Sequence, residues 1–179
     1  PVFLLLMLTG MRPGEATHLL LPEDVDLQRR LLSIRNKPQL GWQVKTRNER
    51  VIPIVSELAD VLEYYIGHRV AGPLITRRSI QSNLASSPAF PDVKAMESAL
   101  MDRSEDLKNS TSELSPRELQ QKAARLVWRE AGAIRTDRIR CEFMRLTRAM
   151  GLPEMTAPKS LRHLFATELQ DKSVDPLIR

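Results

Sequence analysis

The chain is poor in cysteine and has no apolar segment long enough to cross a membrane, and both features restrict what it can be. Its 179 residues include one cysteine, Cys141, so an intramolecular disulfide is excluded and a reducing compartment is indicated. The apolar run PVFLLLMLTG at residues 1–10 is too short to span a bilayer and has no basic segment before it. We therefore expect a cytoplasmic protein without membrane contact.

The excess of basic over acidic side chains is moderate. Lys and Arg number 27 against 22 Asp and Glu, which gives a formal net charge of +5 and a pI of about 9.7. This bias permits contact with nucleic acid or an acidic membrane and proves neither. The length suits one substantial core. Because the chain opens inside an apolar run and ends in SVDPLIR, a typical helix start, we interpret it as a fragment of a longer protein.

Hydrophobic periodicity predicts a mainly helical chain with a short β-rich region. Helices are expected over residues 1–8, 13–22, 56–70, 93–101, 115–132, 136–151 and 157–169. The β-rich runs are LLSIR, WQVKT and RVIPI, and the polar TRNER stretch predicts a hairpin between the second and third. The expected fold class is therefore α+β, mainly α-helical with one small antiparallel three-stranded sheet.

The second half of the chain carries three local predictions. Ser115 and Glu118 form a capping-box pattern at the start of a helix. The polar stretch over residues 102–113 is expected to be a mobile loop. The buried stripe of the 136–151 helix is expected to contain Ile139, Phe143, Leu146 and Met150.

Basic residues gather at one predicted helix start, in APKSLRHLFATEL at residues 157–169. Lys159 and Arg162 are three positions apart and share a helix face, so both can address one anion beside a helix end that already carries partial positive charge. His163 follows directly. Taken alone, two basic residues at this place can also be accidental.

Two further basic residues lie where a phosphate could be held. Arg12 precedes a helix that begins at a proline, where backbone N–H groups are unpaired, although it could instead simply pair with Glu15. Lys45 lies in WQVKT, where strand alternation turns Trp42 and Val44 toward the core and leaves Lys45 on the other face. Such a lysine commonly protects a sheet edge, and it could also reach a leaving oxygen.

The order of these motifs is more informative than any one of them. T-G-x-R-x-G-E closes an apolar helix, K-T precedes R-x-I-P-I, and L-R-H-x-F-A-T follows near the end. In this order they resemble the catalytic domain of the tyrosine site-specific recombinases, or phage integrases. The resemblance covers residues 1–179 as one catalytic-domain fragment. Its exception is residues 80–130, which we interpret as a family-atypical insertion.

The resemblance implies a reaction and a set of residues. Such enzymes cleave one DNA strand by transesterification, as type IB topoisomerases do: a tyrosine attacks the phosphodiester and leaves a 3′-phosphotyrosyl link and a free 5′-hydroxyl, without metal or cofactor. Carried over by position, the catalytic residues are Arg12, Lys45, Lys159 and Arg162, with Glu15 and His163 in supporting structural roles. The arginines would bind the phosphate, and the hairpin lysine would be the general acid.

The chain departs from the family pattern at two points. Lys159 stands where the family usually has histidine; a lysine can donate to a phosphate oxygen but is a poorer base unless desolvated. The nucleophilic tyrosine has no counterpart, because Tyr64 and Tyr65 precede the second arginine and are expected to pack. The fragment alone is therefore predicted not to cleave DNA.

The resemblance also implies a biological setting. We expect double-stranded DNA as the partner, assembly of the full-length protein into a recombination synapse, and a bacterial or phage-encoded mobile element acting at the nucleoid. Two alternatives stay open at this point. One is a non-catalytic DNA-binding protein derived from an integrase, and the other is an unrelated helical regulator in which the motif order is chance.

Overall fold

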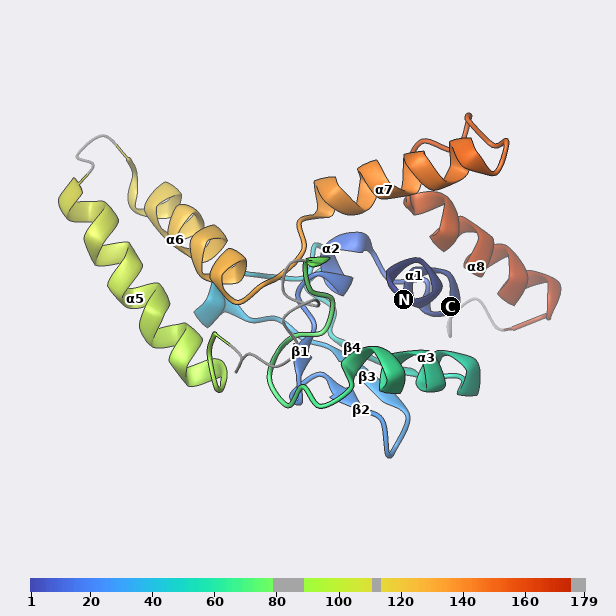
Figure 1. Ribbon diagram of the computed structural model, residues 1–179, viewed down its shortest axis with the longest axis horizontal. Coiled ribbons are helices and arrows are strands. Elements are labelled where there is room, and N and C mark those ends of the chain that lie inside the picture. Colours follow the sequence, from blue (N-terminus) through green and yellow to red (C-terminus); the bar gives the residue numbers. More distant parts are fainter. Residues whose placement is uncertain (79–88, 111–113, 175–179) are drawn as a thin grey trace.

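The computed structural model describes residues 1–78, 89–110 and 114–174 and confirms a mainly helical fold (Figure 1). The helices described are α1 (Val2–Thr9), α2 (Pro13–Ala16), α3 (Ser56–Ile66), α5 (Val93–Ser110), α6 (Pro116–Glu130), α7 (Thr136–Ala149) and α8 (Lys159–Asp171), with a 3-10 turn, η1 (Pro38–Leu40). The strands are β1 (Leu20–Leu21), β2 (Val25–Asp26), β3 (Leu31–Ile34), β4 (Arg50–Pro53) and β5 (Gly72–Pro73). Within these ranges no helix has the length and apolar character needed to span a bilayer.

The predicted three-stranded antiparallel sheet is present, in the order β2-β3-β4. Leu32 at its centre lies opposite Val25 on one side and Ile52 on the other. The alternation of buried and half-buried residues along β3 places Leu32 and Ile34 in the core, as expected for a sheet covered on one face. A second, unpredicted sheet pairs β1 with β5 antiparallel.

The predicted strand WQVKT is wrong, and so is the hairpin assigned to TRNER. Residues 42–46 form no ladder with β4; Trp42 makes an isolated bridge to Lys37, and β3 itself pairs with β4. The reason is that the Asn36 side chain takes the backbone N–H of Val44, at 2.9 Å, which a neighbouring strand would otherwise have bonded. The alternation was nevertheless right, since Val44 is buried and Lys45 exposed.

Two groups of buried apolar side chains hold the elements together. The larger surrounds α1, which lies centrally and is apolar on all sides because α3 and α8 both contact it (Figure 1). Its fully buried members include Leu5, Leu6, Leu32, Leu58, Leu62 and Ile139. The smaller joins Leu20 and Leu40 to the inner face of α5 and α6. Each such leucine stabilises the fold by about 1.5–3 kcal/mol relative to exposure.

The helical hairpin formed by α5 and α6 projects at one end of the molecule (Figure 1). The predicted mobile loop is wrong for residues 102–110, which continue α5; residues 111–113 lie outside the described part. Leu100 and Leu107, seven apart, share the face that packs with α6, and the Ser104 hydroxyl donates to the Leu100 carbonyl at 2.8 Å. An ion pair between Arg103 and Glu130, at 2.9 Å, joins the two helices. The spacing of the two leucines thus favours a helix over residues 102–110 even though most of these residues are polar.

Helix α6 begins as predicted, whereas α7 buries a different stripe. The Glu118 carboxylate accepts the backbone N–H of Ser115 at 2.9 Å, completing the capping box. In α7, Ile139 and Phe143 are buried, but Leu146 and Met150 are 42% and 64% exposed. Thr147 is buried instead, and its hydroxyl donates to the Met155 carbonyl at 2.9 Å. This bond ties the last turn of α7 to the chain that leads into α8.

Candidate functional site

The site is built on the turn that joins α1 to α2. Helix α1 ends because Gly10 adopts a positive φ of 60°, a left-handed conformation that glycine accepts without steric cost. Its N–H still bonds the Leu6 carbonyl at 3.1 Å. The chain then enters α2 at Pro13 and leaves Arg12 as the N-terminal cap residue, as the sequence predicted.

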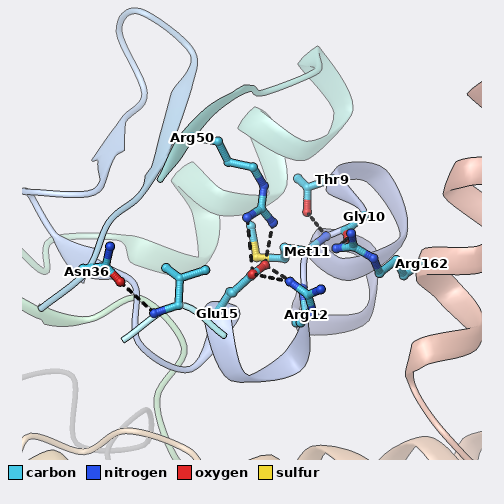
Figure 2. Close-up of polar contacts among 9 residues, drawn as sticks. Thr9, Gly10, Met11, Arg12, Glu15, Asn36, Arg50 and Arg162 are labelled. Atoms are coloured by element: carbon cyan, nitrogen blue, oxygen red, sulfur yellow. Dashed lines mark hydrogen bonds and ion pairs between the residues drawn. The ribbon is translucent and has the colours of Figure 1, made fainter. Parts of the chain in front are cut away.

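Glu15 is the buried centre of the site and holds two arginines (Figure 2). Its side chain is 2% exposed, against 33% for Arg12 and 32% for Arg50. Arg50 Nη2 lies 2.6 Å from Oε2 and Arg12 Nη1 3.2 Å from Oε1, while the backbone N–H of Arg12 donates to Oε2 at 2.8 Å. Burial raises the pKa of Glu15, but the hydrogen bonds from Arg50 and Arg12 outweigh it and lower the pKa overall.

Arg162 reaches the same place from the other end of the chain. Its Nη1 donates to the Gly10 carbonyl at 2.6 Å, although the two residues are separated by 152 positions (Figure 2). Burial lowers the pKa of Arg162, the positive charges of Arg12 and Arg50 lower it further, and only Glu15 opposes them. Arg162 therefore lies within the electric field of the other two guanidinium groups.

We call Arg12, Glu15, Arg50 and Arg162 the arginine cluster. Three guanidinium charges face one carboxylate, so the cluster carries a net charge of +2, and Arg162 has no ion pair with Glu15. Guanidinium groups are planar forks that bind carboxylate or phosphate oxygens in pairs, and they stay charged at neutral pH. An oxyanion at the exposed edges of Arg12 and Arg162 would relieve their repulsion, so the geometry suits a phosphate.

The other predicted site residues lie on exposed positions near this cluster in sequence. Lys45 occupies a turn closed by the Arg47 N–H on the Val44 carbonyl at 2.8 Å, and Lys159 is the exposed first residue of α8. His163, next to Arg162, is also exposed. Across residues 1–78, 89–110 and 114–174, none of these three makes a hydrogen bond or ion pair with the arginine cluster. The structure thus gathers Arg12, Glu15 and Arg162, and leaves Lys45 and Lys159 exposed outside the cluster.

The two tyrosines have different environments on α3. The Tyr65 hydroxyl accepts the backbone N–H of Thr76 at 3.1 Å, and the Arg69 guanidinium lies 5.1 Å from the ring centre. Tyr64 is 92% exposed, so the expectation that both tyrosines pack is wrong for Tyr64. In the part of the chain that the structure describes, no three His, Cys, Asp or Glu side chains are placed to share a metal ion.

Arg50 is the member of the cluster that sequence reasoning missed. It belongs to the R-x-I-P-I motif, whose pattern predicts a strand and does not by itself indicate a site residue. Its partner Glu15 lies 35 positions away, so no local spacing connects the two. The available signal was an unexplained arginine at the start of a strand, next to a predicted basic site.

The domain is mainly helical, and the turn between α1 and α2 receives Arg162 from α8 while Glu15 binds Arg12 and Arg50. The model of the phage integrase family matches residues 2–178, and the chain belongs to that family. Its members are tyrosine recombinases that act in DNA recombination.

The fold is also similar to a solved structure, described as the crystal structure of XerA recombinase. The TM-score is 0.52 at 18% sequence identity, and the match covers 95% of this chain and 43% of that one. The chain therefore spans less than half the length of this structural relative, and the likeness concerns the fold alone. No curated protein sequence matches the chain.

Proposed function

We propose that this chain supplies the phosphate-binding residues and the general acid of a site-specific DNA recombinase. Such a recombinase cleaves and rejoins strands through a 3′-phosphotyrosyl intermediate. The observation that carries this proposal is the meeting of Arg12 and Arg162 around Gly10 and Glu15. Separate basic residues on a DNA-binding surface would not require Arg162 to bond the Gly10 carbonyl beside a buried glutamate that already binds Arg12 and Arg50.

The arginine cluster would act by stabilising charge. Attack on a phosphodiester places negative charge on the non-bridging oxygens of a five-coordinate phosphorus, and fixed donors aimed at these oxygens lower the barrier. Arg12 and Arg162 would supply these donors. Glu15 and Arg50 hold the Arg12 side chain in place, and the Gly10 carbonyl does the same for Arg162 through one N–H, leaving the other N–H groups for the phosphate.

Lys45 would be the general acid that protonates the leaving 5′-oxygen. In support, it lies on the exposed turn that precedes β4, and β4 begins with Arg50 of the cluster. A flexible lysine within reach of the leaving oxygen is suited to proton donation. Lys159, one helical turn before Arg162, would donate to a non-bridging oxygen where the family usually has histidine.

The nucleophile would be a tyrosine that these 179 residues do not supply. The Tyr65 hydroxyl already accepts a hydrogen bond from the backbone N–H of Thr76. Tyr64 lies on the same helix, α3. During the reaction the tyrosine hydroxyl would lose its proton to water as its oxygen bonds to phosphorus. The bond between phosphorus and the 5′-oxygen would break, and the 5′-oxygen would leave with the proton of Lys45. The full-length protein would assemble on double-stranded DNA as a recombination synapse.

A nicked suicide DNA substrate tests this proposal, because loss of the short cleaved strand traps the covalent intermediate. The 179-residue chain should bind this DNA without a covalent band. A form that continues along its gene through a tyrosine beyond Arg179 should give the band. Covalent attachment by the 179-residue chain, lost in Tyr64→Phe, would show that the nucleophile lies on α3 and that our assignment is wrong.

A non-catalytic DNA-binding protein derived from an integrase is the second candidate. Lys159 in place of the usual histidine favours it, since that is the change expected where the chemistry is no longer needed. The buried Glu15 with two arginine partners opposes it, because binding alone does not require this arrangement. Absence of trapping by the tyrosine-containing form, with DNA binding intact, would select this second candidate.

A further inference from the structure

The open end of the helical hairpin contacts the loop that carries Lys45, which we call the Lys45 loop (residues 35–49). Trp128, near the end of α6, is buried, and its indole N–H donates to the Leu40 carbonyl at 3.0 Å. Leu40 is itself fully buried among the apolar side chains of α5 and α6. The hairpin thus contacts the loop both through a hydrogen bond to the loop backbone and through apolar packing.

A histidine completes this contact from the catalytic side. The His18 ring stacks on Trp42 with a centroid separation of 4.8 Å and an interplanar angle of 14°, and meets Trp128 edge-on at 4.6 Å and 73°. Its Nδ1 lies 2.7 Å from the Gly14 carbonyl, so the neutral ring donates from this nitrogen. His18 therefore connects α2, the Lys45 loop and the hairpin.

The fit between the hairpin and the loop leaves no spare room. A Cβ placed on Gly41 would lie 2.6 Å from the Cβ of Ala124 in α6, and Gly41 adopts a positive φ of 67°. The loop can approach α6 this closely only because position 41 has no side chain. Residues 40–42 are accordingly fixed by the hairpin on one side and by His18 on the other.

Lys45 follows this fixed stretch after two residues. The Val44 side chain is buried in the main core, and its N–H is bonded to the Asn36 side chain at 2.9 Å. Asn36, labelled in Figure 2, also donates to the Arg47 carbonyl at 3.3 Å, so the turn around Lys45 is held at both ends. The backbone of Lys45 is thereby placed, while its side chain remains exposed.

From these contacts we propose that the helical hairpin is a positioning element for Lys45, acting through Trp128, Leu40 and Trp42. This inference rests on the proposed function, because it takes Lys45 to approach DNA. It gives a role to a segment in which the sequence shows no motif of the family. The chain leaves the domain at Arg77 and returns at Gly132, where the Arg77 N–H bonds the Gly132 carbonyl at 3.0 Å. The two chain segments that connect the hairpin to the rest of the domain therefore lie side by side, and the hairpin itself packs against the Lys45 loop.

Acetylation of lysines, read by mass spectrometry with and without a short DNA duplex, tests the proposal on the 179-residue chain. In the unaltered chain DNA should lower acetylation of Lys45 several-fold relative to Lys108 on α5. Trp128→Ala should abolish this protection and speed amide hydrogen exchange of residues 40–49. Trp128→Phe, which keeps a ring but lacks the N–H, should have an intermediate effect. Leu107→Ala is the matched control, because Leu107 lies on α5 near the closed end of the hairpin, and the rise of α6 places Trp128 about 18 Å from that end.

The outcomes separate this inference from the proposed function. Equal protection of Lys45 in the unaltered chain and in Trp128→Ala would overturn the positioning role and leave the proposed function standing. Absence of protection in the unaltered chain would overturn the approach of Lys45 to DNA, and the positioning role with it. Loss of protection in Leu107→Ala as well as in Trp128→Ala would also overturn the inference, because general loosening of the hairpin would then suffice.

Discussion

The ring of Phe165 lies directly against the backbone of Gly10. A Cβ at Gly10 would lie 2.3 Å from Cδ1 of Phe165, well inside van der Waals contact. Arg162, one turn earlier on α8, donates to the carbonyl of the same glycine. Gly10 thus contacts α8 in two ways, by packing against Phe165 and by accepting a hydrogen bond from Arg162. Both contacts bring α8 to the arginine cluster.

Gly10→Ala should therefore displace α8 and weaken DNA binding. The alanine would adopt a left-handed conformation that costs about 1–2 kcal/mol, and the clash with Phe165 adds to this. Gly151→Ala is the matched control, since Gly151 also has a positive φ, of 76°, but nothing within 4 Å of its Cβ position. Thermal unfolding and DNA titration should show a larger loss for Gly10→Ala. Equal effects would mean that strain, and not the contact with Phe165, limits this site.

Substitutions in the cluster should separate phosphate binding from the role of Lys159. In a form that contains the tyrosine, Arg162→Ala and Arg12→Ala should each reduce covalent trapping by roughly 10²–10³ in rate, because a charge-assisted donor is lost. Lys159→His should keep a donor near the same oxygen and change the rate by less than about tenfold, or roughly 1.4 kcal/mol of barrier. Full-strength trapping by Arg162→Ala would contradict the cluster's role. Complete loss with Lys159→His would show that the lysine has a function that histidine cannot replace.

His18 should make the fold sensitive to mild acid. Burial lowers the pKa of His18 from 6.5 to about 4, helped by the charge of Lys37 and partly opposed by the Gly14 carbonyl. Between these values the unfolded chain binds a proton that the folded chain does not, so the free energy of unfolding falls as the pH drops. The expected loss is about 2 kcal/mol at pH 5 and about 3 kcal/mol near pH 4.

Chemical denaturation between pH 7 and pH 5 measures this effect. Glu15 also has a lowered pKa and also loses its stabilising effect in acid, but only below its ordinary value of 4.5, outside the window. His18→Gln should remove most of the pH slope, whereas a substitution at the exposed His163 should preserve it. An unchanged slope in His18→Gln would assign the sensitivity to another group.

DNA binding by the 179-residue chain should be sequence-tolerant and sensitive to salt. Each phosphate neutralised contributes about −0.9 to the slope of log K against log salt. Arg12→Ala should make this slope shallower by roughly one such unit. Arg145→Ala offers a comparison, since Arg145 on α7 is exposed and pairs with Glu142 at 2.9 Å. Fluorescence titrations that showed no salt dependence, or no binding at low salt, would contradict a phosphate-directed surface.

Local sequence patterns predicted correctly those helix ends that depend only on residues close in the sequence. The capping box at Ser115 and the termination of α1 at Gly10 follow from residues within one turn, and the structure has both. The failed strand at residues 42–46 shows the limit of such patterns. Its alternation was read correctly, but the decisive partner was the Asn36 side chain, which competes with a strand for the Val44 N–H.

The site was predictable in its parts but not in its assembly. Motif order indicated Arg12 and Arg162 as partners, whereas Arg50 enters only because the return of β4 places it beside Glu15. The contact between Trp128 and Leu40, 88 positions apart, has no signature in either segment. Long-range contacts of this kind depend on the packing of the whole chain, and no single stretch of sequence encodes them.

Helix α8 has no fully buried residue among Lys159–Asp171 and lies mainly along α1. Segments with so little burial open locally far more often than a domain core does. Arg162 would then leave and rejoin the cluster, while Arg12, Glu15 and Arg50 stay together. A phosphate bound by both halves would favour the closed form by mass action, since it binds that form best. The chain would then complete its anion site most fully when DNA is present.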